Sequence, residues 1–400
     1  GQTRNPYILD RNPCGSSSGS AAAVAANLAV AALGTETDGS IVCPSHANAV
    51  VGIKPTVGLT SRAGVVPISH SQDTVGVHAR TVRDAAIVLS ALVGVDARDE
   101  ATQGSAGKFS NDYTQFLDRN GLQGARIGIP RQFFYGYSAK TDKIAEAAIQ
   151  AMQDAGAIIV DPADVPVPGD EAEFTVLLYE FKRDLNAYLA TRRGVPIQTL
   201  ADAIAFNEAH ASREMPYFAQ ELFELAEADL FSEQEYQEAR ARSRRIGGVE
   251  GIDAVLANYN LDALVAPITA PMAPTDLING DYILGGSTSL AAMAGYPIIT
   301  VPAGFAFGMP VGLGFMGTAY SEAKLLRLAY AFEQTVQARR PPRFLPTLPL
   351  PVGKGNDRFA APSEDVLAER IESSPQHSPH REAVAAAPAI PAAMKRMGSW

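Results

Sequence analysis

The stretches GSSSGS (residues 15–20) and GTETDGS (residues 34–40) decide the interpretation of this sequence. Twenty-four positions separate Ser16 from Ser40, and the chain between them is rich in alanine. We expect a short helix over 19–29 and a buried strand over 31–35, which would bring both hydroxyl groups to one place. Consecutive backbone N–H groups before Ser40 could then point at one developing negative charge. An exposed serine beside such N–H groups is typical of acyl transfer from an amide or ester.

The sequence from 15 to 58, which ends in VGIKPTVG (51–58), resembles the amidase signature family. The resemblance continues through SQDTVG (71–76) and returns in AGYPIITVPAG (294–304) and MPVGL (309–313), so that it covers roughly residues 10–340. Within the family, residues 34–44 and LYEFK (178–182) are most similar to bacterial peptide amidases.

The resemblance implies a single large α/β domain, in which a mixed β-sheet is flanked by helices on both faces. It also implies a Ser–cis-Ser–Lys triad that hydrolyses a carboxamide to a carboxylic acid and ammonia through an acyl-enzyme, without cofactor or metal. Ser40 would be the nucleophile, and Ser16 would be the bridging serine, joined to Gly15 by a cis peptide bond.

The resemblance assigns further roles around these two serines. Backbone N–H groups would form the oxyanion hole, and two small hydroxyl side chains would orient the serines. The oxyanion-hole residues would be Thr37, Asp38, Gly39 and Ser40, and the orienting residues would be Ser17 and Thr35. We interpret the Asp38 side chain as structural.

The lysine of the triad has no counterpart before Ser16. The first lysine of the chain is Lys54, which lies downstream of both serines. A serine hydroxyl needs a neighbouring base to become an effective nucleophile. We therefore interpret the chain as a family member whose N-terminal segment is missing, and we expect these 400 residues alone to be nearly inactive. If the lysine is genuinely absent, the alternative is a non-catalytic scaffold.

Two other enzyme classes compete with the amidase. The first is the glutaminase-type subunit of a tRNA-dependent amidotransferase, but such subunits typically carry arginine two residues after the nucleophile, where this chain has Val42. The second is a Ser-His-Asp hydrolase, for which no Gly-x-Ser-x-Gly motif lies between a strand and a helix. The favoured histidine base for that class would be His70, which adjoins the 71–73 loop.

The two cysteines, Cys14 and Cys43, flank the serines closely, so we expect them to lie near each other. Their spacing fits neither a zinc site nor a redox pair. We interpret Cys43, which follows Ile41 and Val42, as a buried small hydrophobic residue.

The net charge of −10 argues against non-specific nucleic-acid binding. No apolar stretch reaches the length of a membrane span. The implied partner is a small-molecule or peptide amide substrate; the sequence leaves oligomeric state and compartment open, with the cytoplasm as default.

The remaining pattern predicts α/β organisation. Strands at 126–130 and 157–160 around a helix at 141–154, capped by Thr141, suggest parallel pairing. Further predicted elements are helices at 81–93 and 321–334 (the latter with Ser321 as N-cap), a strand at 261–266, and paired strands at 298–301 and 311–315. We expect an amidase-signature domain over 1–340 with a mostly helical insertion at 171–258, a Pro-rich linker at 341–352, and a low-complexity, disordered tail at 353–400.

Overall fold

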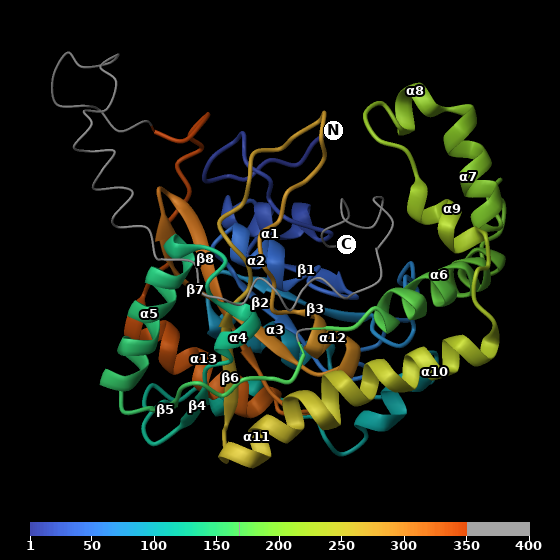
Figure 1. The fold of residues 1–400 in the computed structure, drawn as a ribbon. Helices are drawn as coiled ribbons and strands as arrows, with labels where there is room; N and C mark the ends of the chain where they lie inside the picture. Colours follow the sequence, from blue (N-terminus) through green and yellow to red (C-terminus); the bar gives the residue numbers. More distant parts are fainter. Residues whose placement is uncertain (168, 350–400) are drawn as a thin grey trace, which may run out of the picture. The chain divides into compact units, whose positions relative to one another are not determined.

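A single mixed β-sheet of eight strands organises the chain, in a computed structural model that describes residues 1–167 and 169–349. The strand order is β1-β3-β2-β7-β8-β6-β4-β5 (Figure 1). β4 pairs in parallel with β5 and β6, and the other neighbours are antiparallel. The strands are β1 (Ala31–Glu36), β2 (Val51–Lys54), β3 (Thr74–Ala79), β4 (Arg126–Gly128), β5 (Ile158–Val160), β6 (Ala263–Pro267), β7 (Ile298–Ala306) and β8 (Met309–Met316). The predicted α/β class and the parallel β4–β5 pair are confirmed.

One face of the sheet carries the main hydrophobic core. Because side chains alternate along a strand, Val77, Ile299 and Phe315 share this face. They pack there with apolar residues of three long helices, which are α3 (Val82–Leu92), α5 (Ala139–Asp154) and α13 (Glu322–Val336).

α2 (Val42–Ala47) packs on the opposite face of the sheet. Small residues on both sides, Gly52 in the sheet and Ser45 in α2, allow the helix to approach closely. His78 on this face bonds Ser45 of α2, with 2.8 Å between Nδ1 and Oγ. A Cβ atom on Gly52 would lie 2.2 Å from the Ser45 hydroxyl. This contact requires glycine at position 52, and it fixes the distance between α2 and the sheet.

β1 differs from the prediction, because it forms an edge of the sheet and is only partly buried. Its Leu33 side chain is 49% exposed. The preceding helix, α1 (Ser18–Ala25), is shorter than predicted: Asn27 adopts a φ of 62°, a left-handed conformation that ends a helix and that Asn tolerates well.

Two predicted helix caps need correction. In α5 the N-cap is Ser138, whose hydroxyl accepts the N–H of Thr141 at 3.3 Å, so Thr141 lies inside the helix rather than at its cap. Ser321 does precede α13, but its hydroxyl donates to the carbonyl of Thr318 and caps no helix N–H.

Residues 172–259 form a nearly continuous set of helices, green to yellow in Figure 1. Tyr179 and Tyr236 stack between two of them, with ring centroids 4.2 Å apart. The elements are α6 (Ala172–Ala190), α7 (Leu200–Ala209), α8 (Ala211–Glu214), α9 (Glu221–Glu227), α10 (Glu233–Arg244), the π-helix Arg245–Ile252 and α11 (Asp253–Tyr259). The next helix, α12 (Ser289–Ala294), lies against the π-helix, where Gly247 leaves room for its backbone.

The Pro-rich segment is described only in part. The N–H groups of Phe344 and Leu345 donate to the carbonyls of Pro6 and Tyr7, at 2.9 and 3.2 Å, so this segment lies against the start of the chain. The predicted disordered tail at 353–400 falls outside the described residues. Short elements complete the fold: α4 (Arg131–Phe134) and the 3₁₀ turns Glu100–Ser105 and Tyr113–Phe116.

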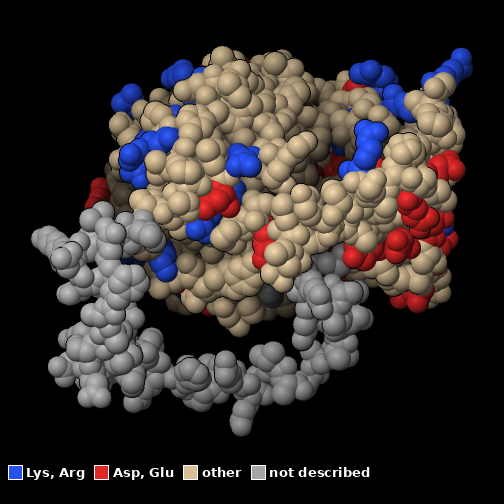
Figure 2. Space-filling view, turned by 90° about the horizontal axis from the view of Figure 1, so that it is seen from above, with Lys and Arg blue, Asp and Glu red and all other residues tan. Residues whose placement is uncertain are grey.

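None of the helices in the described part of the chain is both long and apolar enough to cross a membrane. On the face drawn in Figure 2, Lys and Arg side chains are dispersed, whereas many Asp and Glu side chains gather on one part of it.

Candidate active site

The loops that carry Ser16 and Ser40 lie side by side and bond each other. The N–H of Ser17 donates to the Ser40 carbonyl at 3.1 Å. The Ser17 hydroxyl donates to the carbonyl of Thr35 at 3.1 Å and accepts its N–H at 3.2 Å. The peptide bond from Gly15 to Ser16 is cis, as predicted. Ser17 therefore joins the two loops directly, and Thr35 takes part through its backbone.

Ser40 lies between the end of β1 and the start of α2. Its side chain is buried, with 1% of the residue exposed, and Oγ has no hydrogen-bond partner among residues 1–167 and 169–349. A buried hydroxyl without a partner is uncommon in proteins. Ser16, in the neighbouring loop, is exposed.

Glu36 organises the turn into Ser40, a role that its sequence context does not predict. Its fully buried carboxylate accepts the N–H groups of Gly39 at 3.0 Å, Ile41 at 2.6 Å and Val42 at 2.9 Å. A carboxylate here accepts N–H groups that have no partner within α2, and its negative charge interacts favourably with the positive end of the helix dipole. Burial raises the pKa of Glu36, while the charge of Lys54 and the N–H groups of Val42 and Ile41 oppose that shift.

The four proposed oxyanion donors are not equivalent in the structure. The Gly39 N–H is bound to Glu36, whereas the amides of Thr37, Asp38 and Ser40 have no acceptor within the described part of the chain. Gly39 itself has a φ of 78°, a left-handed conformation that glycine adopts without strain. The turn therefore presents up to three unbonded N–H groups next to Ser40.

The side chains of two aspartates, Asp38 and Asp73, form hydrogen bonds around this turn. The Asp38 carboxylate accepts the hydroxyl of Ser289 at 2.8 Å, and burial raises the pKa of Asp38. Asp73 accepts the Thr37 hydroxyl at 2.6 Å and the N–H groups of Ile68 and Ser69 at 2.8 and 2.9 Å. Burial raises the pKa of Asp73 to about 6. Both contacts favour a supporting role for these side chains.

Lys54 is the first lysine of the chain, and it is fully buried. Its ammonium group donates to the carbonyls of Ala291 at 3.0 Å and Tyr296 at 2.5 Å. Burial lowers the pKa of Lys54 to about 8. The lysine is thus turned toward the end of α12 and bonds neither serine.

The histidines are likewise engaged elsewhere. His46 bonds the backbone of Gly312, His78 bonds Ser45, and burial lowers the pKa of both imidazoles to about 4. His70 places Nδ1 3.0 Å from an Asp184 oxygen and Nε2 3.2 Å from a Glu180 oxygen, and its bond to Asp184 raises its pKa. No Lys or His side chain in the described ranges hydrogen-bonds Ser16 or Ser40, so the structure lends the histidine-base alternative no support.

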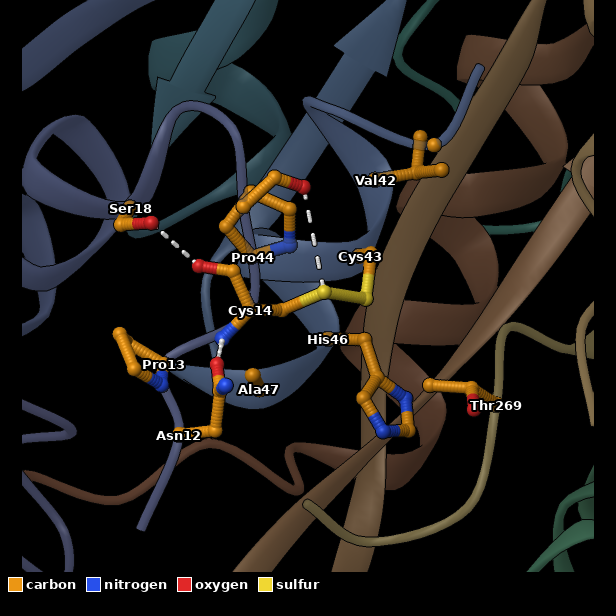
Figure 3. Close-up of a disulfide and its surroundings, with 12 residues drawn as sticks. Asn12, Pro13, Cys14, Ser18, Val42, Cys43, Pro44, His46, Ala47 and Thr269 are labelled. Atoms are coloured by element: carbon orange, nitrogen blue, oxygen red, sulfur yellow. Dashed lines mark hydrogen bonds between the residues drawn. A yellow bond between two sulfur atoms is a disulfide. The ribbon is translucent and has the colours of Figure 1, made fainter. Parts of the chain in front are cut away.

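Cys14 and Cys43 form a disulfide, which Figure 3 shows between the Ser16 loop and α2. The prediction that they lie near each other is confirmed, with 5.8 Å between their Cα atoms. Cys43 is buried, as predicted, with 7% of the residue exposed, but its sulfur is bonded to Cys14 instead of packing as a small hydrophobic side chain. Its N–H donates to the Gly39 carbonyl at 2.8 Å, and this first turn of α2 directs Cys43 toward Cys14.

Comparison with known proteins points to one family. The family model described as Amidase matches residues 1–326. A probable amidase of Arabidopsis thaliana is 42% identical over 354 residues, which are 86% of this chain and 64% of the relative. A glutamyl-tRNA(Gln) amidotransferase subunit from Halorhodospira halophila is 34% identical, over 84% of this chain and 69% of its own length.

Solved structures agree. A peptide amidase from Stenotrophomonas maltophilia superimposes with a TM-score of 0.81 and 53% identity, over 86% of this chain and 70% of that one. The corresponding amidotransferase subunit from Thermotoga maritima has a TM-score of 0.62 and 29% identity, over 87% of this chain and 72% of that one. The chain spans 59–64% of the length of the three amidase relatives from Arabidopsis and two fungi. The match over residues 1–326, with these relatives, shows that the chain belongs to the amidase family.

Proposed function

We propose that this chain carries the nucleophile of an amidase that hydrolyses a carboxamide to a carboxylic acid and ammonia. The observation that supports the proposal most is the buried Oγ of Ser40, which has no hydrogen-bond partner among the described residues and lies beside the N–H groups of Thr37, Asp38 and Ser40, which likewise have no acceptor there. A nucleophile needs a neighbouring site where the carbonyl oxygen can become negative, and this turn offers one.

The proposed reaction has two halves. Ser40 Oγ attacks the amide carbon and loses its proton, the C–N bond breaks, and the proton passes through Ser16 to the leaving nitrogen, which departs as ammonia. Water then attacks the ester on Ser40 and releases the acid and the free serine. During each attack the oxyanion lies against the unbonded N–H groups, each worth about 3–4 kcal/mol in comparable enzymes.

The proton relay also needs a base. Among the described residues, no lysine or histidine bonds Ser16 or Ser40. A general base typically contributes about 10²–10⁴-fold to the rate. We therefore expect residues 1–400, assayed alone, to hydrolyse amides slowly.

For the substrate we propose a peptide C-terminal amide. The support is the 53% identity to two solved structures, one of a peptide amidase from Stenotrophomonas maltophilia and one of a peptide amidase in complex with the competitive inhibitor chymostatin. The amidotransferase subunit from Thermotoga maritima is less similar, at 29% identity and a TM-score of 0.62. We therefore rank a glutaminase function second.

The test is ammonia release from a peptide amide, a simple aliphatic amide and glutamine, with Ser40→Ala and Ser20→Ala as a matched pair. Ser20 lies in the same Gly/Ser stretch, but its hydroxyl only donates to the carbonyl of Leu33 at 2.8 Å. We expect Ser40→Ala to abolish hydrolysis and Ser20→Ala to retain it, with the peptide amide favoured. Glutamine hydrolysed faster than the peptide amide would favour the amidotransferase function instead.

A further inference from the structure

We propose that the Cys14–Cys43 disulfide is a clamp that positions the two serines, so that the reactivity of Ser40 depends on the oxidised state of this bond. The inference rests on the proposed function of Ser40 and Ser16. It assigns both cysteines as positioning residues.

The bond joins the two serine loops close to the serines themselves. Cys14 lies two residues before Ser16, and Cys43 lies three residues after Ser40. Cys43 is fixed to the nucleophile turn through its N–H bond to the Gly39 carbonyl. A displacement of one cysteine is therefore transmitted to the serine beside it.

Cys14 is itself held firmly in its loop. Its N–H donates to the side-chain oxygen of Asn12 at 2.7 Å, and its carbonyl accepts the hydroxyl of Ser18 at 2.5 Å (Figure 3). Cys14 also has a φ of 57°, a left-handed backbone that few non-glycine residues adopt. These contacts fix the direction in which the chain leaves Cys14 toward Ser16.

Few other bonds join the two loops. Between residues 14–18 and 34–43, the described structure shows three hydrogen bonds, and Ser17 makes all of them: its N–H bonds the Ser40 carbonyl, and its hydroxyl bonds the carbonyl and N–H of Thr35. Ser16 is exposed, and the strand that leads to the nucleophile turn is an edge strand. Without the disulfide, the distance between the serines would depend mainly on Ser17.

The chemistry of the clamp is a two-electron exchange. Two thiols lose two protons and two electrons to an oxidant, such as a second disulfide that is reduced to its dithiol, and a phosphine or dithiol reductant reverses the step. Cys14 and Cys43 are 5% and 7% exposed, so we expect reduction in the native state to be slow. Disulfides of this kind persist in oxidising compartments.

The first measurement counts thiols in the 400-residue chain, purified without reductant and unfolded in guanidinium. We expect no free thiol before reduction and two after it, because these are the two cysteines of the sequence. Two free thiols before reduction, in protein exposed to oxidised glutathione, would overturn the clamp whatever the enzyme does.

The second measurement compares Cys14→Ser, Cys43→Ser and the double variant by hydrogen exchange and by the rate at which a fluorophosphonate modifies Ser40. Each single change breaks the same bond, so we expect all three to behave alike. Exchange should accelerate in residues 14–20 and 39–47, and modification should slow by about tenfold or more, since small displacements of reacting groups cost up to about 10²-fold. Reduction of the wild type should reproduce the effect, and re-oxidation should reverse it.

The matched control is Val24→Ala, which removes fully buried volume from α1 without touching the disulfide. If Val24→Ala slows modification as much as loss of the bond, or if the cysteine variants match the wild type, the clamp is overturned. If Ser40 is modified in none of the proteins, the proposed function fails. The thiol count and the hydrogen-exchange comparison then still test whether the disulfide forms and fixes the two loops.

Discussion

Glu36→Gln tests whether one buried carboxylate holds the nucleophile turn. Glutamine has one acceptor oxygen, whereas Glu36 accepts three N–H groups with two oxygens. If that oxygen stays with Ile41 and Val42, which share Oε2, the new amide group faces the Gly39 N–H and leaves it without an acceptor. An unpaired buried donor costs about 1–3 kcal/mol, and two bonds lose about 1 kcal/mol each when their acceptor loses its charge.

Part of this cost is offset because the neutral glutamine does not bury a charge. Burial of the charged Glu36 side chain is unfavourable, as its raised pKa indicates. We expect the free energy of unfolding to fall by about 2–3 kcal/mol, measured by urea denaturation at pH 7. The control is Glu333→Gln, because Glu333 Oε1 accepts one backbone N–H, that of Val82 at 2.8 Å, and an amide oxygen can replace it. A Glu36→Gln variant no less stable than Glu333→Gln would refute the role given to Glu36.

Two further predictions concern the supports of the same turn. The pKa of Asp73 is raised to about 6 from an ordinary 3.8, so the folded state binds a proton more tightly than the unfolded state. This contribution is present below about pH 4 and is lost as pH rises through 6. We expect the free energy of unfolding of the wild type to fall by about 2 kcal/mol more than that of Asp73→Asn between pH 4 and 6.5. Parallel pH profiles of the two proteins would contradict it. Gly52→Ala places a Cβ atom 2.2 Å from the Ser45 hydroxyl and must push α2 off the sheet, so we expect a loss of about 1–3 kcal/mol and slower hydrolysis. Gly19→Ala, whose Cβ meets nothing within 4 Å, is the control, and an equal loss in both variants would argue against this packing.

The sequence predicted the parts of the site that depend on local motifs. Ser16 and Ser40 do lie on adjoining loops, and the peptide bond before Ser16 is cis. Apolar stretches also predicted six of the eight strands of the central sheet, but not β2 (Val51–Lys54) or β3 (Thr74–Ala79). These features follow from short stretches of chain and from the family resemblance, and both are visible without coordinates.

The residues that the sequence did not reveal act through tertiary contacts. In the sequence, Glu36 is one polar residue among several in a loop, and its role becomes visible only because α2 begins at Val42. Pro44, which lies within 42–47, argued against a helix there. The disulfide could not be predicted from the sequence, because the pairing depends on the direction in which α2 carries Cys43 toward Cys14. The edge position of β1 depends on strand order, which alternation within one strand does not encode.

The central claim is that Ser40 is the nucleophile. The most direct test treats the 400-residue chain with an excess of a peptidyl phosphonate and maps the modified residue by mass spectrometry of its peptides. We expect one adduct, on Ser40, that is absent from Ser40→Ala and retained in Ser20→Ala. An adduct on another residue, or one of equal yield in Ser40→Ala, would contradict the central claim.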